Sequence, residues 1–188
     1  MPHINILKEM FKSSEVIPLE DHPYGNGTKQ VTLSEENLYS VAIKGLPEEG
    51  SVIVLKIDNF PAPSKIFKGS KGECKRADFV IITNSGNKKI VLFIEMKAKS
   101  TTEKSQHIIK QLKGAQCVIK YIEEIGKLFW DNDFLEGFKY RSVALMDINI
   151  NKKESRNSSA EQIHDSPDSM LKIKAPCYIQ YNQLIGRL

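Results

Sequence analysis

Two apolar segments joined by a four-residue polar turn constrain the fold of this chain more than any other feature. The first segment runs from Arg76 to Thr83, the second from Lys89 to Ala98, and Asn84–Asn87 lies between them. Both are rich in Val, Ile and Phe, which are typical of strands, and so short a connection joins antiparallel neighbours. The sequence therefore predicts a β-hairpin. The apolar run that precedes Glu95 indicates that the second strand is central and buried on both faces.

Three charged residues stand at the same end of this predicted hairpin. Asp78 lies near the start of the first strand, and Glu95 and Lys97 close the second strand two residues apart, so the last two share one face. Charges at the end of a central strand cost free energy unless they are paired or bound to a metal. Adjacent carboxylates repel each other, and their oxygens suit Mg²⁺ or Mn²⁺. An ammonium beside them can orient a water or stabilise a phosphate, and a structural ion pair between Glu95 and Lys97 is the alternative.

Weaker local patterns predict the elements around the hairpin. Residues 1–30 begin as a helix and continue as a connector rich in Pro and Gly. Ser34 as an N-cap, with apolar residues at helical spacing behind it, predicts a helix that ends at Gly45. The other predicted elements are strands at 51–57, 141–148 and 172–180, a helix from 102 to about 130 that Gly114 or Gly126 could interrupt, loops at 59–72 and 149–168, and a tail at 184–188.

Length and composition indicate an ordinary globular domain. The chain has 188 residues, of which 40% are hydrophobic and 27% charged, and we expect one domain over 1–188 with its core at about 34–148. A polar loop at 149–170 and a terminal strand and tail at 171–188 would follow that core. No apolar run approaches a membrane span and no secretory signal is visible, so we expect a cytoplasmic protein without a membrane partner. The net charge of +4 is a mild indication of a polyanionic partner.

Cysteine and histidine residues give no metal-binding pattern. The three cysteines (Cys74, Cys117 and Cys177) are far apart, and no two of the four histidines have the spacing of a helical zinc motif. We expect reduced, partly buried thiols.

The residues Ala77-Asp78-Phe79, then Ile94-Glu95-Met96-Lys97, then a long helix, resemble the PD-(D/E)xK nuclease superfamily over roughly Ser34 to Ile148. The resemblance implies an α/β restriction-endonuclease-like fold, a mixed central β-sheet flanked by helices with an αβββαβ core. It also implies a nuclease that hydrolyses phosphodiester bonds with Mg²⁺ or Mn²⁺, DNA being favoured over RNA. A homodimer and a subunit of a larger defence or repair complex are both compatible with it. The alternative is an inactive nuclease-fold module that binds nucleic acid or a protein partner.

The same resemblance implies roles by motif position. Asp78, Glu95 and the backbone carbonyl of Met96 would be metal ligands, and Lys97 the catalytic lysine, although Ala77 stands where proline is common. A further metal-ligating acid on the first helix would be Glu36, with Glu35 as the alternative, and helix-dipole stabilisation is the other explanation for both. Gln111 takes the place of a catalytic glutamine found in some branches, although Ala115 replaces the tyrosine that follows it there. A surface polar residue is the other explanation for Gln111.

Basic and aromatic residues around this motif are candidates for nucleic-acid contacts. Arg76 would contact phosphate or pair with a nearby acid. A basic rim that binds backbone phosphates, or a solvated helix face, would account for Lys99, Lys104, Lys110 and Lys113. Phe129 and Trp130 would stack on bases, but packing in the core is the favoured role for such a pair.

Overall fold

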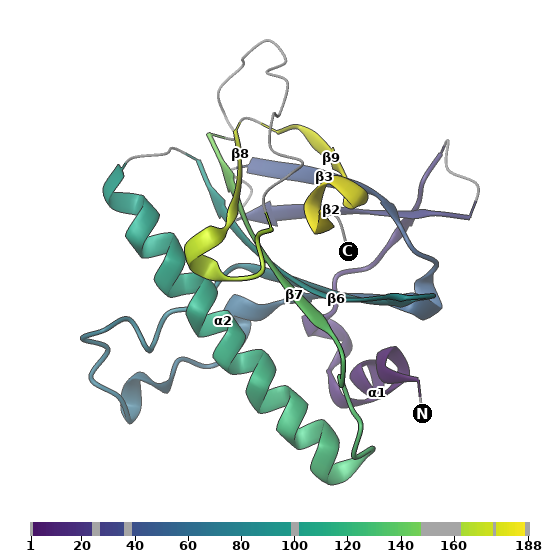
Figure 1. Ribbon diagram of the computed structural model, residues 1–188, viewed down its shortest axis with the longest axis horizontal. Coiled ribbons are helices and arrows are strands. Elements are labelled where there is room, and N and C mark those ends of the chain that lie inside the picture. The colour runs from purple at the N-terminus through teal and green to yellow at the C-terminus, as the bar shows by residue number, and fades with distance from the viewer. Residues whose placement is uncertain are drawn as a thin grey trace.

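The computed structural model describes residues 2–23, 27–35, 39–98, 102–147, 163–174 and 176–186, with the backbone alone at 102–104. The described residues form a mixed α/β fold with two mixed β-sheets and a few helices. Figure 1 shows three layers: a large sheet in the middle, helices α1 and α2 on one side of it, and a small sheet on the other side. The predicted sheet flanked by helices is therefore covered by helices on one face and by the second sheet on the other.

The large sheet contains the predicted hairpin. Its strands, in spatial order, are β4 (Val52–Lys56), β5 (Phe79–Ser85), β6 (Lys88–Lys97), β7 (Lys139–Met146) and β8 (Leu171–Lys174). Neighbours from β4 to β6 are antiparallel, whereas β6, β7 and β8 are parallel. Strand β6 pairs on both edges and is buried from Ile90 to Met96, which confirms the prediction of a central strand. The first strand begins at Phe79 instead of Arg76, so Asp78 directly precedes it.

Two helices cover one face of the large sheet. Helix α1 (His3–Met10) confirms the predicted helical start, and α2 (Thr102–Phe129) connects β6 to its parallel neighbour β7. Helix α2 buries a stripe at spacings of three and four residues: Ile108, Leu112, Ala115, Ile119 and Ile122. Each buried Ile or Leu contributes on the order of 1.5–3 kcal/mol. Gly114 and Gly126 do not interrupt it. A Cβ at Gly114 would lie 1.7 Å from the Lys75 carbonyl oxygen, and one at Gly126 would lie 2.0 Å from the Phe134 ring, so both glycines permit close packing.

The small sheet corrects the prediction of a helix ending at Gly45. Its strands, in spatial order, are β1 (Glu20–Asp21), β2 (Lys29–Glu35), β3 (Tyr39–Leu46) and β9 (Tyr178–Gln180). Val31 and Leu33 on β2, and Val41 and Ile43 on β3, are fully buried against the large sheet. This period of two matches the strand better than the helix, and sheet packing outweighs the capping pattern at Ser34.

The C-terminal region also differs from the prediction. Instead of one strand at 172–180, β8 joins the large sheet and β9 pairs in parallel with β3 of the small sheet. Pro176, which cannot donate a backbone hydrogen bond, lies between them. The predicted tail overlaps helix α3 (Tyr181–Ile185), whose Tyr181 hydroxyl bonds the Thr83 hydroxyl at 2.6 Å. Of the predicted loop at 149–168, only 163–168 lies within the described residues, with a 3₁₀ turn at Pro167–Ser169.

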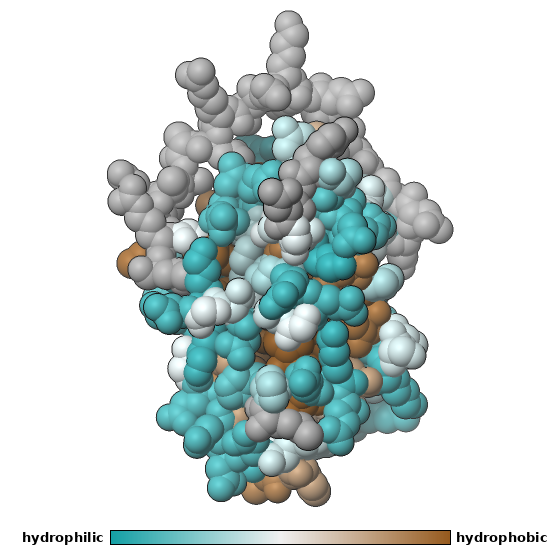
Figure 2. Space-filling model, turned by 90° about the vertical axis from the view of Figure 1, so that its right-hand side faces the viewer, coloured by the Kyte–Doolittle hydropathy of each residue, from teal (hydrophilic) through white to brown (hydrophobic). Residues whose placement is uncertain are grey.

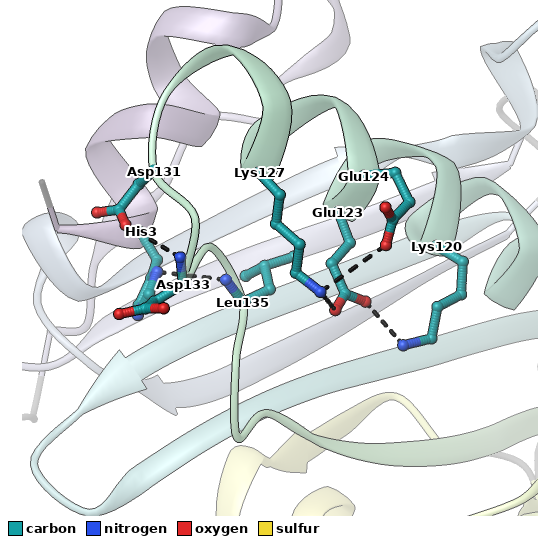
Figure 3. A network of polar contacts seen from close by, with 8 residues as sticks. All are labelled: His3, Lys120, Glu123, Glu124, Lys127, Asp131, Asp133 and Leu135. Carbon is teal, nitrogen blue, oxygen red and sulfur yellow. Dashed lines mark hydrogen bonds and ion pairs between the residues drawn. The ribbon is translucent and has the colours of Figure 1, made fainter.

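Polar contacts lie within the far end of α2 and between the segment that follows it and α1 (Figure 3). The Glu123 carboxylate accepts from Lys120 and Lys127 at 2.7 Å each, and the Leu135 amide donates to the His3 ring at 3.3 Å, which joins the segment after α2 to α1.

Phe129 and Trp130, expected in the core, are 76% and 38% exposed. The surface on the right-hand side of Figure 1 is mainly hydrophilic, with apolar groups in its centre and at its lower end (Figure 2).

The remaining sequence predictions concern loops and thiols. The predicted loop at 59–72 is confirmed, and it contains a 3₁₀ turn at Pro63–Lys65. Other 3₁₀ turns lie at Ser13–Glu15, Glu49–Ser51 and Ile57–Asn59. The cysteines are free, as predicted, but only Cys74 is partly buried, while Cys117 and Cys177 are exposed.

Candidate functional site

The hairpin register brings Asp78, Glu95 and Lys97 together on one face. Val80 pairs with Phe93 and Phe79 with Ile94, so the next step of the register sets Asp78 across from Glu95. Directly opposite residues of an antiparallel pair point to the same face. Val80 and Phe93 belong to the apolar layer beneath the helices, so the three charged side chains continue that helix-covered face at the end of the hairpin.

Glu95 is a fully buried acid whose charge is incompletely balanced. Its exposed fraction is 0%, Oε1 forms an ion pair with the Lys97 ammonium, and Oε2 has no hydrogen-bond partner among the described residues. Burial, followed by the nearby Asp78 charge, raises the pKa of Glu95 to about 8, although Lys97 acts in the opposite direction. Such a carboxylate is costly in the interior unless it is protonated or binds a cation.

Asp78 is held beside Glu95 by the backbone of β6. The Met96 amide donates a hydrogen bond to Asp78 Oδ2 at 2.7 Å, and the Asp78 carbonyl accepts one from the Ile57 amide at 3.0 Å. Asp78 is 7% exposed. Burial raises its pKa to about 7, with further upward effects from the Glu35 and Asp58 charges, against the opposing effects of the Met96 amide and the lysine. Two neighbouring carboxyls therefore both resist ionisation.

Lys97 supplies the positive charge of this group. Its side chain is 26% exposed, which gives the site contact with solvent. Burial alone lowers the pKa of Lys97, but the charges of Glu95, Asp78 and Glu35 outweigh burial, so the pKa lies above its usual value. Lys97 is therefore an ammonium at neutral pH.

The small sheet contributes a third acid and a hydroxyl to this end of the hairpin. Glu35, at the end of β2, contacts Lys56 at 3.7 Å, and its charge acts on Asp78, Glu95 and Lys97. The Tyr39 hydroxyl, at the start of β3, donates to the Met96 carbonyl at 3.4 Å. Glu36, the preferred acid in the sequence prediction, lies outside the described residues, whereas its alternative Glu35 lies near the site on a strand instead of a helix.

Sequence reasoning did not include Tyr39 or Asp58. The position of Tyr39 depends on how the two sheets pack, and no local pattern shows this. Asp58 had a usable signal, because it follows the apolar strand β4 and antiparallel pairing brings the end of β4 to the start of β5, where Asp78 lies. Asp58 contacts Lys56 at 4.0 Å.

Gln111 and Arg76 lie next to the group through the segment that precedes β5. Gln111 Nε2 donates to the Arg76 carbonyl at 3.3 Å, while Gln111 Oε1 and Arg76 Nε are buried without a hydrogen-bond partner among the described residues. Burial raises the pKa of Asp58 overall, although the Arg76 charge lowers it. Gln111 thus contacts the backbone two residues before Asp78, not the carboxylates themselves.

The lysines of the predicted basic rim differ in their surroundings. Lys113 forms an ion pair with Asp168 at 2.9 Å, so its charge is already paired. Lys110 packs its stem against Gly72. Lys99 and the side chain of Lys104 lie outside the described residues. In their place, Lys75 Nζ contacts the His107 ring at 2.8 Å beside the site.

The donors at the hairpin end fit a hard divalent cation through two carboxylates and a backbone oxygen. In the stretches that the structure describes, no three His, Cys, Asp or Glu side chains form a metal-binding group. The orphaned, buried Oε2 of Glu95 is nevertheless the kind of atom that a cation satisfies, and oxygen donors are what Mg²⁺ and Mn²⁺ prefer. Asp78 Oδ1 and the Met96 carbonyl would complete such a set.

Comparisons of the chain with protein-family models, with curated proteins and with solved structures give no match. Within the described ranges, no helix is both long enough and apolar enough to cross a membrane.

Proposed function

We propose that this chain is a metal-dependent nuclease that hydrolyses phosphodiester bonds, with DNA favoured over RNA. The observation that carries the proposal is the state of Glu95: a fully buried acid, one oxygen of which has no partner among the described residues, across from a second carboxyl whose pKa is also raised. An acid buried for stability alone would be expected to have its hydrogen bonds satisfied. Strongly perturbed pKa values that involve a specific charge partner are typical of functional sites.

The order of elements supports the same family of functions. Helix α1, strands β4, β5 and β6, helix α2 and strand β7 follow one another as the helix, three strands, helix and strand of the PD-(D/E)xK superfamily, if β1–β3 are an insertion. In this proposal α1 replaces the helix predicted before Gly45. Glu35 on β2 takes the role that the resemblance gives to an acid of the first helix.

Asp78, Glu95 and the Met96 carbonyl would hold Mg²⁺ or Mn²⁺. The ion, when bound, would polarise the phosphate and lower the pKa of a bound water. Because metal ligands must be ionised, the raised pKa values of the two acids imply that cation binding competes with protons near neutral pH.

The side chains of the chain itself have distinct roles in this proposal. The Lys97 ammonium donates hydrogen bonds to the attacking water or to a phosphate oxygen and stabilises the negative charge that develops there. Because its pKa is raised, Lys97 acts as a donor and not as the base that accepts the proton of water. Gln111 positions the segment that carries Asp78 by its bond to the Arg76 carbonyl.

One observation favours a second candidate, a non-cutting module that binds nucleic acid. The Lys97 ammonium already forms an ion pair with Glu95, so the lysine could serve to neutralise that acid without any metal. Titration with Mn²⁺ followed by calorimetry separates the two candidates. Binding that is lost in Asp78→Ala supports the nuclease, and no binding in the unmodified protein supports the module.

A cleavage screen tests the proposed activity directly. Purified protein is incubated with linear, circular, single-stranded and branched DNA, and with matching RNA, in Mg²⁺, Mn²⁺ or EDTA. We expect metal-dependent cleavage of at least one DNA substrate and none in Asp78→Ala. Activity that persists in that variant would come from a contaminant, and RNA cleavage without DNA cleavage would reverse the substrate assignment.

A further inference from the structure

The loop between β4 and β5 is rich in lysine and presents two large apolar side chains to solvent. From Lys65 to Arg76 it contains four lysines and one arginine against a single acid, Glu73. Ile66 and Phe67 are 81% and 53% exposed. Figure 1 shows the loop protruding from the body of the molecule beside α2. Neither apolar side chain is used by the site at the hairpin end.

This loop is fixed by contacts with α2 and with itself. The Lys75 carbonyl lies over Gly114 of α2, and Gly72 lies against the stem of Lys110. Within the loop, the Phe67 amide donates to the Pro63 carbonyl at 2.9 Å, and Cys74 Sγ donates to the Phe67 carbonyl at 3.7 Å. The apolar side chains at its tip are therefore held outward by an ordered backbone, and exposed apolar groups of this kind indicate an interaction surface.

The positive charge of the loop is available for a ligand. Glu73 points both of its oxygens at the loop backbone, where they accept from the Gly69 and Lys71 amides at 2.9 Å each. Lys65, Lys68 and Lys71 are exposed, and they form no ion pair with any described residue. A polyanion could therefore bind to these lysines without displacing an existing carboxylate.

The charged surface continues from the loop to the hairpin end. Lys75 contacts the His107 ring at 2.8 Å, and the pKa of His107 is lowered by burial and by the charges of Lys75, Lys97 and Lys110. One histidine thus lies near a lysine of the loop and the lysine of the site. The loop also runs directly into Asp78. A polyanion bound along the loop would therefore extend toward Asp78 and Glu95.

We propose that residues 65–76 form a binding site for single-stranded nucleic acid, with the lysines on backbone phosphates and Phe67 stacked on an unpaired base. Phosphate contacts by lysine together with base stacking on an aromatic ring are how sequence-tolerant binders hold single strands. A base can stack on a side chain in this way only when it is free of its duplex partner. The identity of the polyanion rests on the proposed nuclease function, whereas the surface itself rests on the exposure and charge of the loop.

Fluorescence anisotropy with a labelled 20-nucleotide DNA of mixed sequence tests this site in EDTA, where metal-dependent cutting cannot occur. The loop variant carries Lys65→Gln, Lys68→Gln and Lys71→Gln. Its matched control carries Lys12→Gln, Lys88→Gln and Lys139→Gln, which remove the same charge after α1 and at the ends of β6 and β7 remote from Lys97. Circular dichroism confirms that both variants fold.

We expect the loop variant to bind at least tenfold more weakly than the unmodified protein at low salt. Its slope of log Kd against log salt should fall by about 2, since three phosphate contacts on a single strand contribute about 0.7 each. Phe67→Ala should weaken binding about fivefold or more without changing that slope, because it removes stacking and not charge. The matched control should weaken binding much less than the loop variant.

Equal weakening by the loop variant and its control would overturn the site, because the lysines would then act only through net charge. Unchanged binding in Phe67→Ala would overturn the stacking role. Vesicles of phosphatidylcholine and phosphatidylserine form a further arm, because lysines beside exposed apolar residues also suit an anionic membrane. Vesicle binding that the loop variant abolishes, with oligonucleotide affinity unchanged, would replace nucleic acid by a membrane surface.

Failure of the proposed binding site and failure of the proposed catalysis would give different experimental results. A protein that never cuts, yet loses oligonucleotide affinity in the loop variant, retains the binding site and loses the nuclease. A protein that cuts with Mg²⁺, and binds and cuts equally well with or without the loop lysines, retains the nuclease and loses the binding site. A labelled RNA of the same sequence in the binding assay then shows which polymer the loop prefers.

Discussion

Two buried glutamates of this molecule have opposite electrostatic environments. Glu123 on α2 is 7% exposed and receives two ammonium groups, from Lys120 and Lys127, at 2.7 Å each (Figure 3). Glu95 on β6 is 0% exposed, shares one lysine and lies across from Asp78. Burial raises the pKa of both acids, but the two lysines reverse this for Glu123, whose pKa is lowered, whereas that of Glu95 reaches about 8.

The difference shows that burial of an acid does not by itself indicate function. At Glu123 the chain supplies enough positive charge to satisfy the carboxylate, as expected for a structural role. At Glu95 one oxygen has no hydrogen-bond partner among the described residues and a second acid lies nearby, so this carboxyl group is either protonated or requires a cation. The following experiments test whether this contrast is one between structure and function.

The largest expected effect comes from removing one lysine of each pair. Lys97→Ala should lower the rate of metal-dependent DNA cleavage by about 100- to 1000-fold, the typical loss for a donor that stabilises transition-state charge. Lys127→Ala, which removes a lysine from Glu123, should leave the cleavage rate within about twofold, since it touches no reacting group. Single-turnover cleavage measures both, and full activity in Lys97→Ala would refute the assignment of this lysine.

The next largest effect should be the pH dependence of stability, to which Glu95 and Glu123 contribute with opposite sign. Asp78 and Glu95, with pKa values of about 7 and about 8, retain protons in the folded state that the unfolded chain has lost above pH ~4. The free energy of unfolding should therefore fall as pH rises from about 4 to about 8, on the order of a few kcal/mol. Glu123, with its lowered pKa, contributes in the opposite sense, since its stabilisation is lost only on acidification through that lowered pKa.

Urea denaturation in EDTA between pH 5 and 9 measures this dependence. The variant with Asp78→Asn and Glu95→Gln should lose most of the decline in stability toward alkaline pH. A decline of equal size in that variant would assign it to other groups.

Neutralising Glu95 or Glu123 should change the free energy of unfolding by a smaller amount, and in opposite directions for the two residues. Glu95→Gln should raise the free energy of unfolding at pH 9 by about 1 kcal/mol, because it removes a buried charge that has one cation and one repelling neighbour. Glu123→Gln should lower it by about 1.5 kcal/mol, because two charge-assisted hydrogen bonds are weakened. Destabilisation by both substitutions would mean that Glu95 is as well satisfied as Glu123.

A thermal response to metal of similar size is also expected. At a Mn²⁺ concentration ten times its Kd, binding would stabilise the protein by about 1.4 kcal/mol, or roughly 3–5 °C in Tm for a chain of this size. Glu123→Gln should retain this shift and Asp78→Asn should lose it. Differential scanning fluorimetry with and without Mn²⁺ provides the comparison, and an equal shift in both variants would place the ion elsewhere.

The parts of the fold that were predicted correctly are those with strong local patterns. The hairpin follows from two apolar runs and a short turn, and α2 follows from an apolar stripe along 28 residues. The hairpin also gives most of the candidate site, because its register alone places Asp78 across from Glu95. Those signals lie within or between adjacent segments, so no knowledge of the remaining chain is needed.

The parts that could not be predicted depend on contacts between distant segments. Leu33, Val41 and Ile43 become buried only when β2 and β3 pack on the large sheet, and this packing outweighs the capping signal at Ser34. For the same reason Tyr39 reaches the site from the small sheet, and no pattern near Asp78 indicates it. Glu35, the alternative acid implied by the resemblance, comes from the same sheet, on a strand instead of the expected helix. Pro176 is a local signal against the single strand predicted at 172–180, but the assignment of β8 and β9 to different sheets depends on tertiary structure.

The absence of a side chain at position 114 has a consequence for the chemistry at the hairpin. Alanine there would improve the intrinsic helical preference of α2, yet its methyl group would collide with the Lys75 carbonyl and push outward the backbone that leads, three residues later, to Asp78. The position of the Asp78 carboxyl group relative to that of Glu95 would then change. The intrinsic helical preference of α2 and the position of the backbone before Asp78 thus place conflicting demands on this one residue, and glycine meets the second at the expense of the first.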